Sequence, residues 1–127
     1  MKQYESLEQQ RLFLWWRILG HTALGVPACA MFAIPNGGKR SLKTAMTLKR
    51  EGVQTGIPDI FLAAPAGGHH GLFIELKRPG RPGVSKGRPT QAQLEVMQHL
   101  QEQGYACVLA YGADEAQAAI EKYLGGQ

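Results

Sequence analysis

The sequence has no apolar run long enough to cross a membrane, and its start is polar. Its longest unbroken apolar segment, residues 12–16, lies between Arg11 and Arg17, and a second apolar stretch over residues 23–35 is interrupted. A membrane-spanning helix needs roughly 18 to 20 apolar residues. The start at Met1 to Glu5 does not resemble a secretory signal peptide. We therefore expect a soluble protein of the cytoplasm.

Cysteine is scarce, and a zinc site is not indicated. Cys29 and Cys107 are too few to form a metal cage, and His69 and His70 have no further ligand at zinc spacing. Because nothing indicates secretion, we expect both cysteines to be reduced and mostly buried thiols.

Internal repeats and a phosphate-binding loop are also missing. The pair Gly38-Lys39 would need glycine at position 33 and serine or threonine at position 40, but Ala33 and Arg40 stand there. This excludes the commonest nucleotide-binding motif.

The composition is that of an ordinary globular domain. Of the 127 residues, 44% are hydrophobic and 19% are charged, which predicts one domain over residues 1–127 with a single core. Lysine and arginine number 14 against 10 acidic residues, so the net charge is +4. A net charge of this size is a weak argument for a nucleic-acid partner, so its distribution matters more.

Hydrophobic periodicity and turn signals predict a sequence of helices and strands. Gly20, Gly52 and Gly104 are expected to end helices, and residues 79–89 form an irregular basic segment that predicts a mobile surface loop. Together the elements predict an α/β domain. The predicted helices are residues 5–19, 41–51 (capped by Ser41), 90–104 and 114–124, and the predicted strands are 29–34, 59–63, 71–77 and 105–111.

The helical spacing also predicts which side chains face the core. In the first helix these are Leu12, Trp15, Trp16 and Leu19. In the later helices they are Leu42, Ala45, Met46, Leu94, Met97, Leu100, Ala116, Ile120 and Tyr123.

Side chains alternate along the strand at 71–77, so Glu75 and Lys77 share one face. Asp59 begins the strand that pairs with it through a turn at 65–68, so its carboxylate can reach the same region. Two acids and a lysine at one sheet edge suit a hard divalent cation, which can bind a phosphate and acidify a water. A cross-strand salt bridge is the simpler interpretation of the same residues.

Glu8 lies on the helix stripe that faces the core, four residues before Leu12 and seven before Trp15. A buried carboxylate needs a partner, and a cation site would supply one. The alternative is an acid stabilised by the helix dipole, although this suits Glu5 better.

Basic residues gather in two windows that contain no acid. They could bind a phosphate backbone, and the alternative is a solvated charged face. The first window contains Lys39, Arg40, Lys43, Lys49 and Arg50, and the second contains Lys77, Arg78, Arg81, Lys86 and Arg88.

Thr90 and Gln93 have the spacing of a capping box at the start of a helix. This structural role is sufficient to explain both residues, but it does not exclude a second role for Gln93.

In order and spacing, these motifs resemble the VRR-NUC domain of the PD-(D/E)XK nuclease superfamily, in the stand-alone form common in bacteriophages. Each motif alone is loose, and the resemblance covers residues 5–124. The segments that carry it are Glu8-Gln9, residues 34–40, Leu48-Lys49 with residues 51–53, Gly56-Ile57-Pro58-Asp59, Phe73-Ile74-Glu75-Leu76-Lys77, and Thr90 with Gln93.

The resemblance implies a restriction-endonuclease-like core, with a mixed four-stranded sheet between helices in the order αβ(α)ββαβα. It implies that Asp59, Glu75 and the Leu76 carbonyl bind Mg²⁺ or Mn²⁺ and that Lys77 positions or deprotonates the attacking water. Gln93 matches a glutamine common in the superfamily. Glu8 would complete the acidic cluster, although Glu5 remains an alternative.

The resemblance also implies a metal-dependent DNA endonuclease that cuts branched DNA, such as four-way junctions, as a homodimer. Trp15 or Trp16 and residues 23–34 could supply the apolar dimer surface. The rivals are a nuclease of flaps or ordinary duplex, and a non-catalytic DNA-binding module. The expected DNA contacts are Asn36, Gly37, Lys39, Arg40, Lys43, Lys49, Arg78, Arg81, Lys86 and Arg88.

Overall fold

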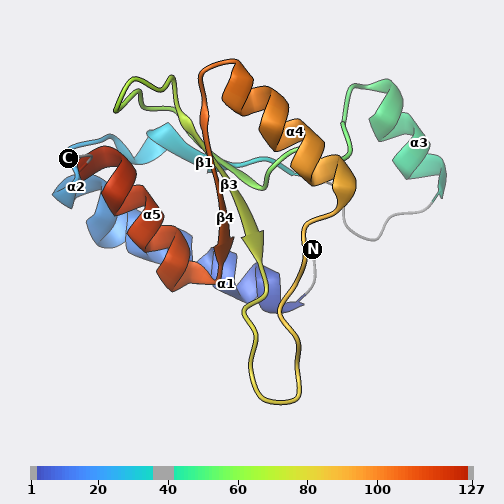
Figure 1. The fold of residues 1–127 in the computed structure, drawn as a ribbon, viewed down its shortest axis with the longest axis horizontal. Coiled ribbons are helices and arrows are strands. Elements are labelled where there is room, and N and C mark those ends of the chain that lie inside the picture. The colour runs from blue at the N-terminus through green and yellow to red at the C-terminus, as the bar shows by residue number, and fades with distance from the viewer. Residues whose placement is uncertain (1–2, 36–41, 126–127) are drawn as a thin grey trace.

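The computed structural model describes residues 3–35 and 42–125, which form a mixed four-stranded sheet with helices on both faces (Figure 1). The strand order is β1-β2-β3-β4, with β3 and β4 parallel and the other neighbours antiparallel. The expected α/β architecture is therefore confirmed. The strands are β1 (Met31–Ala33), β2 (Ile60–Leu62), β3 (Leu72–Lys77) and β4 (Ala106–Tyr111); the helices are α1 (Gln3–Trp15), α2 (His21–Ala23), α3 (Leu42–Arg50), α4 (Gln91–Glu102) and α5 (Ala113–Gly125).

The hydrophobic core lies between the sheet and the pair of helices α1 and α5 (Figure 1). The sheet contributes alternate residues such as Ile60, Ile74 and Leu76, none of which is exposed, and the helices contribute Trp16 and Ile120. Burying each such side chain stabilises the fold by about 1.5 to 3 kcal/mol. The core therefore fixes which face of β3 is left for polar residues.

The opposite face of the sheet is covered by α4, while α3 stands apart from the sheet beyond it (Figure 1). Thr90 caps α4 through the full capping box, because its hydroxyl accepts from the Gln93 amide and the Gln93 side chain accepts from the Thr90 amide. The expected cap is confirmed. Gly52 and Gly104 end α3 and α4 with positive φ, as expected.

The first helix is longer and differently phased than the spacing predicts. A π-helical turn, Trp16–Gly20, follows α1, and the chain continues in helical conformation through α2, so the prediction that Gly20 ends the helix is wrong. The extra residue in the wide turn shifts the phase, so Gly20 is buried and Leu19 is 59% exposed. A Cβ added at Gly20 would lie 2.7 Å from the Trp15 ring, so any larger residue at this position requires the ring to shift.

Several other expectations are corrected. The predicted strand at 29–34 is shorter, because residues 28–30 form a 3₁₀ turn, and Cys29 is exposed rather than buried. Ala45 and Met46 are exposed because α3 does not pack on the sheet, and Leu94 lies on the outer side of α4, which buries Met97 instead. Ser41, the predicted cap of the second helix, lies outside the described residues.

Within residues 3–35 and 42–125, no helix is long and apolar enough to span a membrane.

Candidate active site

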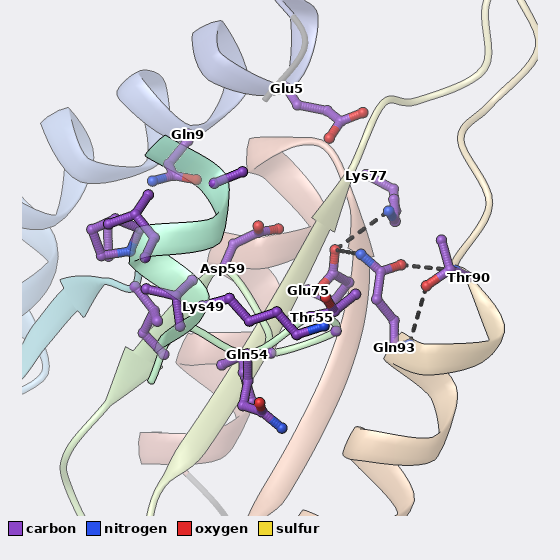
Figure 2. A pocket seen from close by; sticks show the side chains of 18 residues that line it. Glu5, Gln9, Lys49, Gln54, Thr55, Asp59, Glu75, Lys77, Thr90 and Gln93 are labelled. Atoms are coloured by element: carbon purple, nitrogen blue, oxygen red, sulfur yellow. Dashed lines mark hydrogen bonds and ion pairs between the residues drawn. The ribbon is translucent and has the colours of Figure 1, made fainter. Parts of the chain in front are cut away.

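A cleft of about 660 Å³ lies at the end of β3, where several parts of the chain meet (Figure 2). The sheet contributes Asp59, Glu75 and Lys77, and α4 and its cap contribute Gln93 and Thr90. The expected convergence of Asp59, Glu75, Lys77 and Gln93 is therefore what the structure shows. The remaining polar lining residues are Glu5 and Gln9 from α1, Lys49 from α3, and Gln54 and Thr55 from the segment before Asp59.

Strand register brings the two carboxylates together. Ile60 pairs with Ile74 in the antiparallel β2–β3 ladder, so Asp59 and Glu75 are the next residues facing each other. Asp59 is fixed further by its own groups: its Oδ2 accepts a hydrogen bond of 2.8 Å from the Leu76 amide, and its carbonyl accepts one from Ile34. Asp59 is therefore held at its backbone and its side chain.

Glu75 is the most enclosed charged group in the cleft, with 1% of its surface exposed. Its Oε2 accepts a hydrogen bond from Gln93 Nε2 at 3.1 Å and lies 3.4 Å from Lys77 Nζ. Its Oε1 is buried and has no hydrogen-bond partner among the described residues. A buried carboxylate oxygen without a partner is costly, which indicates that another group completes this site.

Burial, and after it the neighbouring Asp59 carboxylate, raise the pKa of Glu75 to about 8, against the opposing effect of Lys77. Two carboxylates that face each other disfavour the ionised form of Glu75, and a bound cation would offset their repulsion. The cleft is therefore electrostatically prepared for a cation.

The salt-bridge interpretation is realised only in part. The ion pair joins Lys77 to Glu75 on the same strand, and it involves one of the two Glu75 oxygens. The other oxygen stays without a partner in the described part of the chain, so the ion pair alone does not account for this cluster.

Gln93 has two roles at once. Its Oε1 accepts from the Thr90 amide in the capping box while its Nε2 donates to Glu75 (Figure 2). The two contacts fix which way the amide points. A local helix cap thereby orients the carboxylate of a distant strand.

The donor set fits a hard divalent cation. Within residues 3–35 and 42–125 no three His, Cys, Asp or Glu side chains gather closely enough to enclose a metal, so Asp59 and Glu75 are the carboxylate pair. Mg²⁺ is usually bound by one or two carboxylates together with waters and substrate phosphates. The bare Glu75 Oε1 agrees with this pattern.

The acid that α1 contributes to the cleft is Glu5, not Glu8. Glu8 Oε1 accepts a 2.8 Å hydrogen bond from the Ala113 amide at the start of α5, and its carboxylate pairs with Arg11 at 3.1 Å. Glu8 thus caps a helix, and its expected place in the acidic cluster is corrected. The spacing argument identified the buried side of α1 but not which neighbour lies beside each turn.

Gln9 is a cleft residue that the sequence analysis did not propose as a site residue. It lies one helical turn after Glu5, so both project from the same side of α1 (Figure 2). Its Oε1 is buried without a hydrogen-bond partner among the described residues. The available signals were its four-residue spacing from Glu5 and its place in the Glu8-Gln9 segment of the family resemblance.

The predicted DNA-contacting residues that the structure describes lie in two places, on α3 and in the loop after β3. Lys43 and Lys49 are on α3, and the loop after β3 projects from the body of the molecule (Figure 1). In that loop the Arg81 guanidinium lies 3.7 Å from the Tyr4 ring centroid and Lys86 Nζ lies 4.1 Å from that of Tyr111. Arg78 donates to the Ser85 carbonyl and Arg88 is exposed, whereas Asn36, Gly37, Lys39 and Arg40 lie outside the described residues.

Comparison with known proteins agrees with the geometry. The model of the VRR-NUC domain family matches residues 3–114. A solved structure described as a VRR_NUC domain protein is 28% identical, with a TM-score of 0.78 over 98% of this chain and 91% of that one. No protein of curated function matches at a significant level.

Proposed function

The chain belongs to the VRR-NUC domain family of nucleases, and from that premise we propose that it is a Mg²⁺- or Mn²⁺-dependent DNA endonuclease selective for branched DNA. The observation that carries the metal dependence is the bare, buried Oε1 of Glu75 opposite Asp59. A divalent cation is the group that both carboxylates could bind together.

Each residue of the site has a distinct task in this proposal. Asp59 and Glu75 would hold the cation, with the Leu76 carbonyl as a third ligand, and the cation would bind a phosphate oxygen and acidify a water. Lys77 orients that water, because its amine is held at 3.4 Å from Glu75. Gln93 keeps the Glu75 carboxylate in place through a 3.1 Å hydrogen bond.

The placement of basic side chains supports DNA as the substrate. Lys49 lines the cleft, and Arg81 and Lys86 lie on the loop that leaves β3 directly after Lys77. Positive charge therefore flanks the carboxylate pair on two different elements, as a phosphate backbone passing through the cleft would require.

We also propose that the protein acts as a homodimer through the outer face of α1 and the edge strand β1. Leu7, Leu14 and Ile18 are exposed at 48%, 60% and 71%, and Phe32 on β1 at 46%. Leu7, Leu14 and Phe32 line a groove of about 1000 Å³, and an apolar groove beside an unpaired strand edge favours a second copy of the same surface. Trp16 is fully buried, so the expected contribution of that residue to a dimer surface is corrected.

The dimer is tested by solution mass. We expect the wild type to have twice the chain mass in light scattering, and Leu14→Glu to have the mass of one chain with an unchanged circular dichroism spectrum. A wild type that stays monomeric at every concentration at which it cuts DNA would contradict the dimer.

Cleavage assays separate the nuclease from its rivals. We expect the wild type with Mn²⁺ to cut a four-way junction faster than a flap or a linear duplex at equal salt. Asp59→Asn and Lys77→Ala should lose cutting and retain most binding. Equal rates on all three DNAs would favour a nuclease without junction preference, and DNA binding without cutting would favour a non-catalytic module.

A further inference from the structure

A second lysine, Lys49, lies in the catalytic cleft, and no step of the proposed chemistry uses it. It belongs to the last turn of α3, and its side chain extends across the cleft toward Glu75 (Figure 2). In this view its amine lies on the other side of Glu75 from the amine of Lys77. The cleft therefore presents positive charge from two walls.

Lys49 differs from Lys77 in its exposure and in its ion pairing. Lys77 is 8% exposed and paired with Glu75 at 3.4 Å, whereas Lys49 is exposed and makes no ion pair within the described part of the chain. The charge of Lys49 is therefore available to an anion that enters the cleft.

The end of α3 fixes where Lys49 starts. The Gly52 amide donates to the Lys49 carbonyl and the Val53 amide to the Leu48 carbonyl, so the helix closes there and the chain turns toward Asp59. The backbone of Lys49 is thus tied to the segment that leads into the carboxylate pair.

Charge balance gives this lysine a task. The cleft contains the carboxylates of Glu5, Asp59 and Glu75, but among the described residues neither these three nor any other His, Cys, Asp or Glu side chains form a group of three that could hold a metal ion. Sites with two metal ions stabilise both the attacking and the leaving oxygen of a phosphoryl transfer. If the carboxylate pair holds one cation, positive charge at the leaving oxygen has to come from a side chain.

We propose that Lys49 is a catalytic residue that stabilises the sugar oxygen leaving the scissile phosphate, in place of a second metal ion. This assignment rests on the proposed nuclease function. The oxygen of water forms a bond to phosphorus, and the bond from phosphorus to the sugar oxygen breaks. That oxygen keeps the electron pair and takes a proton from solvent, the water's proton goes to solvent, and Lys49 remains an ammonium group throughout. Attack from the Lys77 side and departure toward Lys49 would place the two oxygens on opposite sides of the phosphorus, as an in-line displacement requires.

The test compares the wild type with Lys49→Ala on the DNA structure that the wild type cuts fastest. We expect the rate at saturating DNA to fall about 100-fold, the loss typical of removing one group that stabilises a leaving or developing oxyanion. DNA affinity, measured by anisotropy with Ca²⁺ in place of Mn²⁺, should weaken less than about tenfold, because one phosphate contact is lost. Binding of Mn²⁺ in calorimetry should stay at one ion per chain in both proteins.

The decisive experiment uses a DNA substrate in which sulfur replaces the sugar oxygen that leaves the scissile phosphate. A thiolate leaves without help, so the difference between wild type and Lys49→Ala should shrink to less than about fivefold on that DNA. Lys49→Arg keeps the charge and should restore most of the rate. Lys122→Ala removes the same charge from the exposed side of α5, outside the cleft, and should cut like the wild type.

The two proposals fail in different ways. A wild type that does not cut DNA with any divalent cation would refute the nuclease function. A wild type that cuts, together with a Lys49→Ala variant that cuts equally fast, or one whose defect is the same with oxygen and sulfur, would overturn the role of Lys49 alone. Two Mn²⁺ ions per chain in the wild type would also overturn it.

Discussion

At the scale of single residues, the distinctive feature of the cleft is the unequal bonding of the two carboxylate oxygens of Glu75. One of its oxygens has two partners and the other has none within the described chain. Burial and Asp59 together hold its pKa near 8, so in the absence of a cation Glu75 keeps its proton at neutral pH. The same carboxylate is therefore a source of instability that bound metal would relieve.

The raised pKa of Glu75 predicts a pH-dependent stability. The folded protein holds a proton that the unfolded chain releases between pH 4.5 and about 8, so the free energy of unfolding falls as pH rises through that window. Glu75→Gln cannot titrate, and we expect it to gain about 1 to 3 kcal/mol relative to the wild type between pH 5 and pH 8.5. Urea denaturation in EDTA measures this difference, and parallel pH profiles for the two proteins would contradict it.

The two acids of α1 should separate stability from activity. Glu8→Gln weakens the cap of α5, so we expect a loss of about 1 kcal/mol of stability with cleavage retained. Glu5→Gln leaves every described hydrogen bond in place and should instead lower cleavage, because Glu5 lines the cleft. Thermal melting and cleavage rates of both variants decide the matter. A variant pair with the opposite pattern would restore Glu8 to the site.

At the scale of elements, the sequence correctly predicted those features that depend on interactions between residues close together in the chain. Alternation along residues 71–77 placed Glu75 and Lys77 correctly because β3 buries Ile74 and Leu76 on its other face. The capping box was predictable because its two hydrogen bonds lie within four residues. The part that Gln93 plays toward Glu75 was not readable in the same way, because it depends on how α4 lies across the sheet.

Features that depend on distant neighbours could not be read from the pattern. The π-helical turn reflects the packing of Trp15 on Gly20, and it moved Leu19 to the surface. Likewise, helical spacing located Glu8 on the inner side of α1, but only the position of α5 showed that its partner is the Ala113 amide.

The close packing of Trp15 on Gly20 predicts that alanine at position 20 lowers the stability of the protein. Alanine normally stabilises a helix by about 1 kcal/mol over glycine, and the φ of Gly20 is helical at −60°. At Gly20, however, a Cβ would meet the Trp15 ring at 2.7 Å, so we expect Gly20→Ala to lower stability by about 2 kcal/mol. Gly125→Ala, at the end of α5 with open space around it, is the matched control and should be neutral. Equal melting temperatures for the two variants would show that Trp15 moves freely.

At the scale of the whole molecule, the hydrophobic core and the candidate active site lie in different parts of the fold. The core between α1, α5 and one sheet face supports the strands, while the carboxylate pair stands at the end of β3 and the basic loop leaves directly from it (Figure 1). The apolar groove beside α1 shares Gln9 and Ala33 with the cleft but none of its carboxylates, so a second copy bound in the groove would border the cleft.

The whole arrangement also predicts a strong dependence on salt. Several separate cations would contact phosphates, so we expect DNA affinity to fall by about 10³-fold between 50 mM and 200 mM salt. Lys86→Ala should reduce the slope of log affinity against log salt by about one, since it removes a single contact. Anisotropy titrations with Ca²⁺ measure both slopes, and an affinity independent of salt would contradict a phosphate-backbone ligand.

The central claim, that Asp59 and Glu75 together bind a divalent cation, is tested most directly by anomalous diffraction from crystals soaked in Mn²⁺. The account predicts a single anomalous peak between the two carboxylates, within coordination distance of Glu75 Oε1, and its loss in Asp59→Asn. No peak at Mn²⁺ concentrations that support cleavage, or a peak that persists in Asp59→Asn, would contradict it.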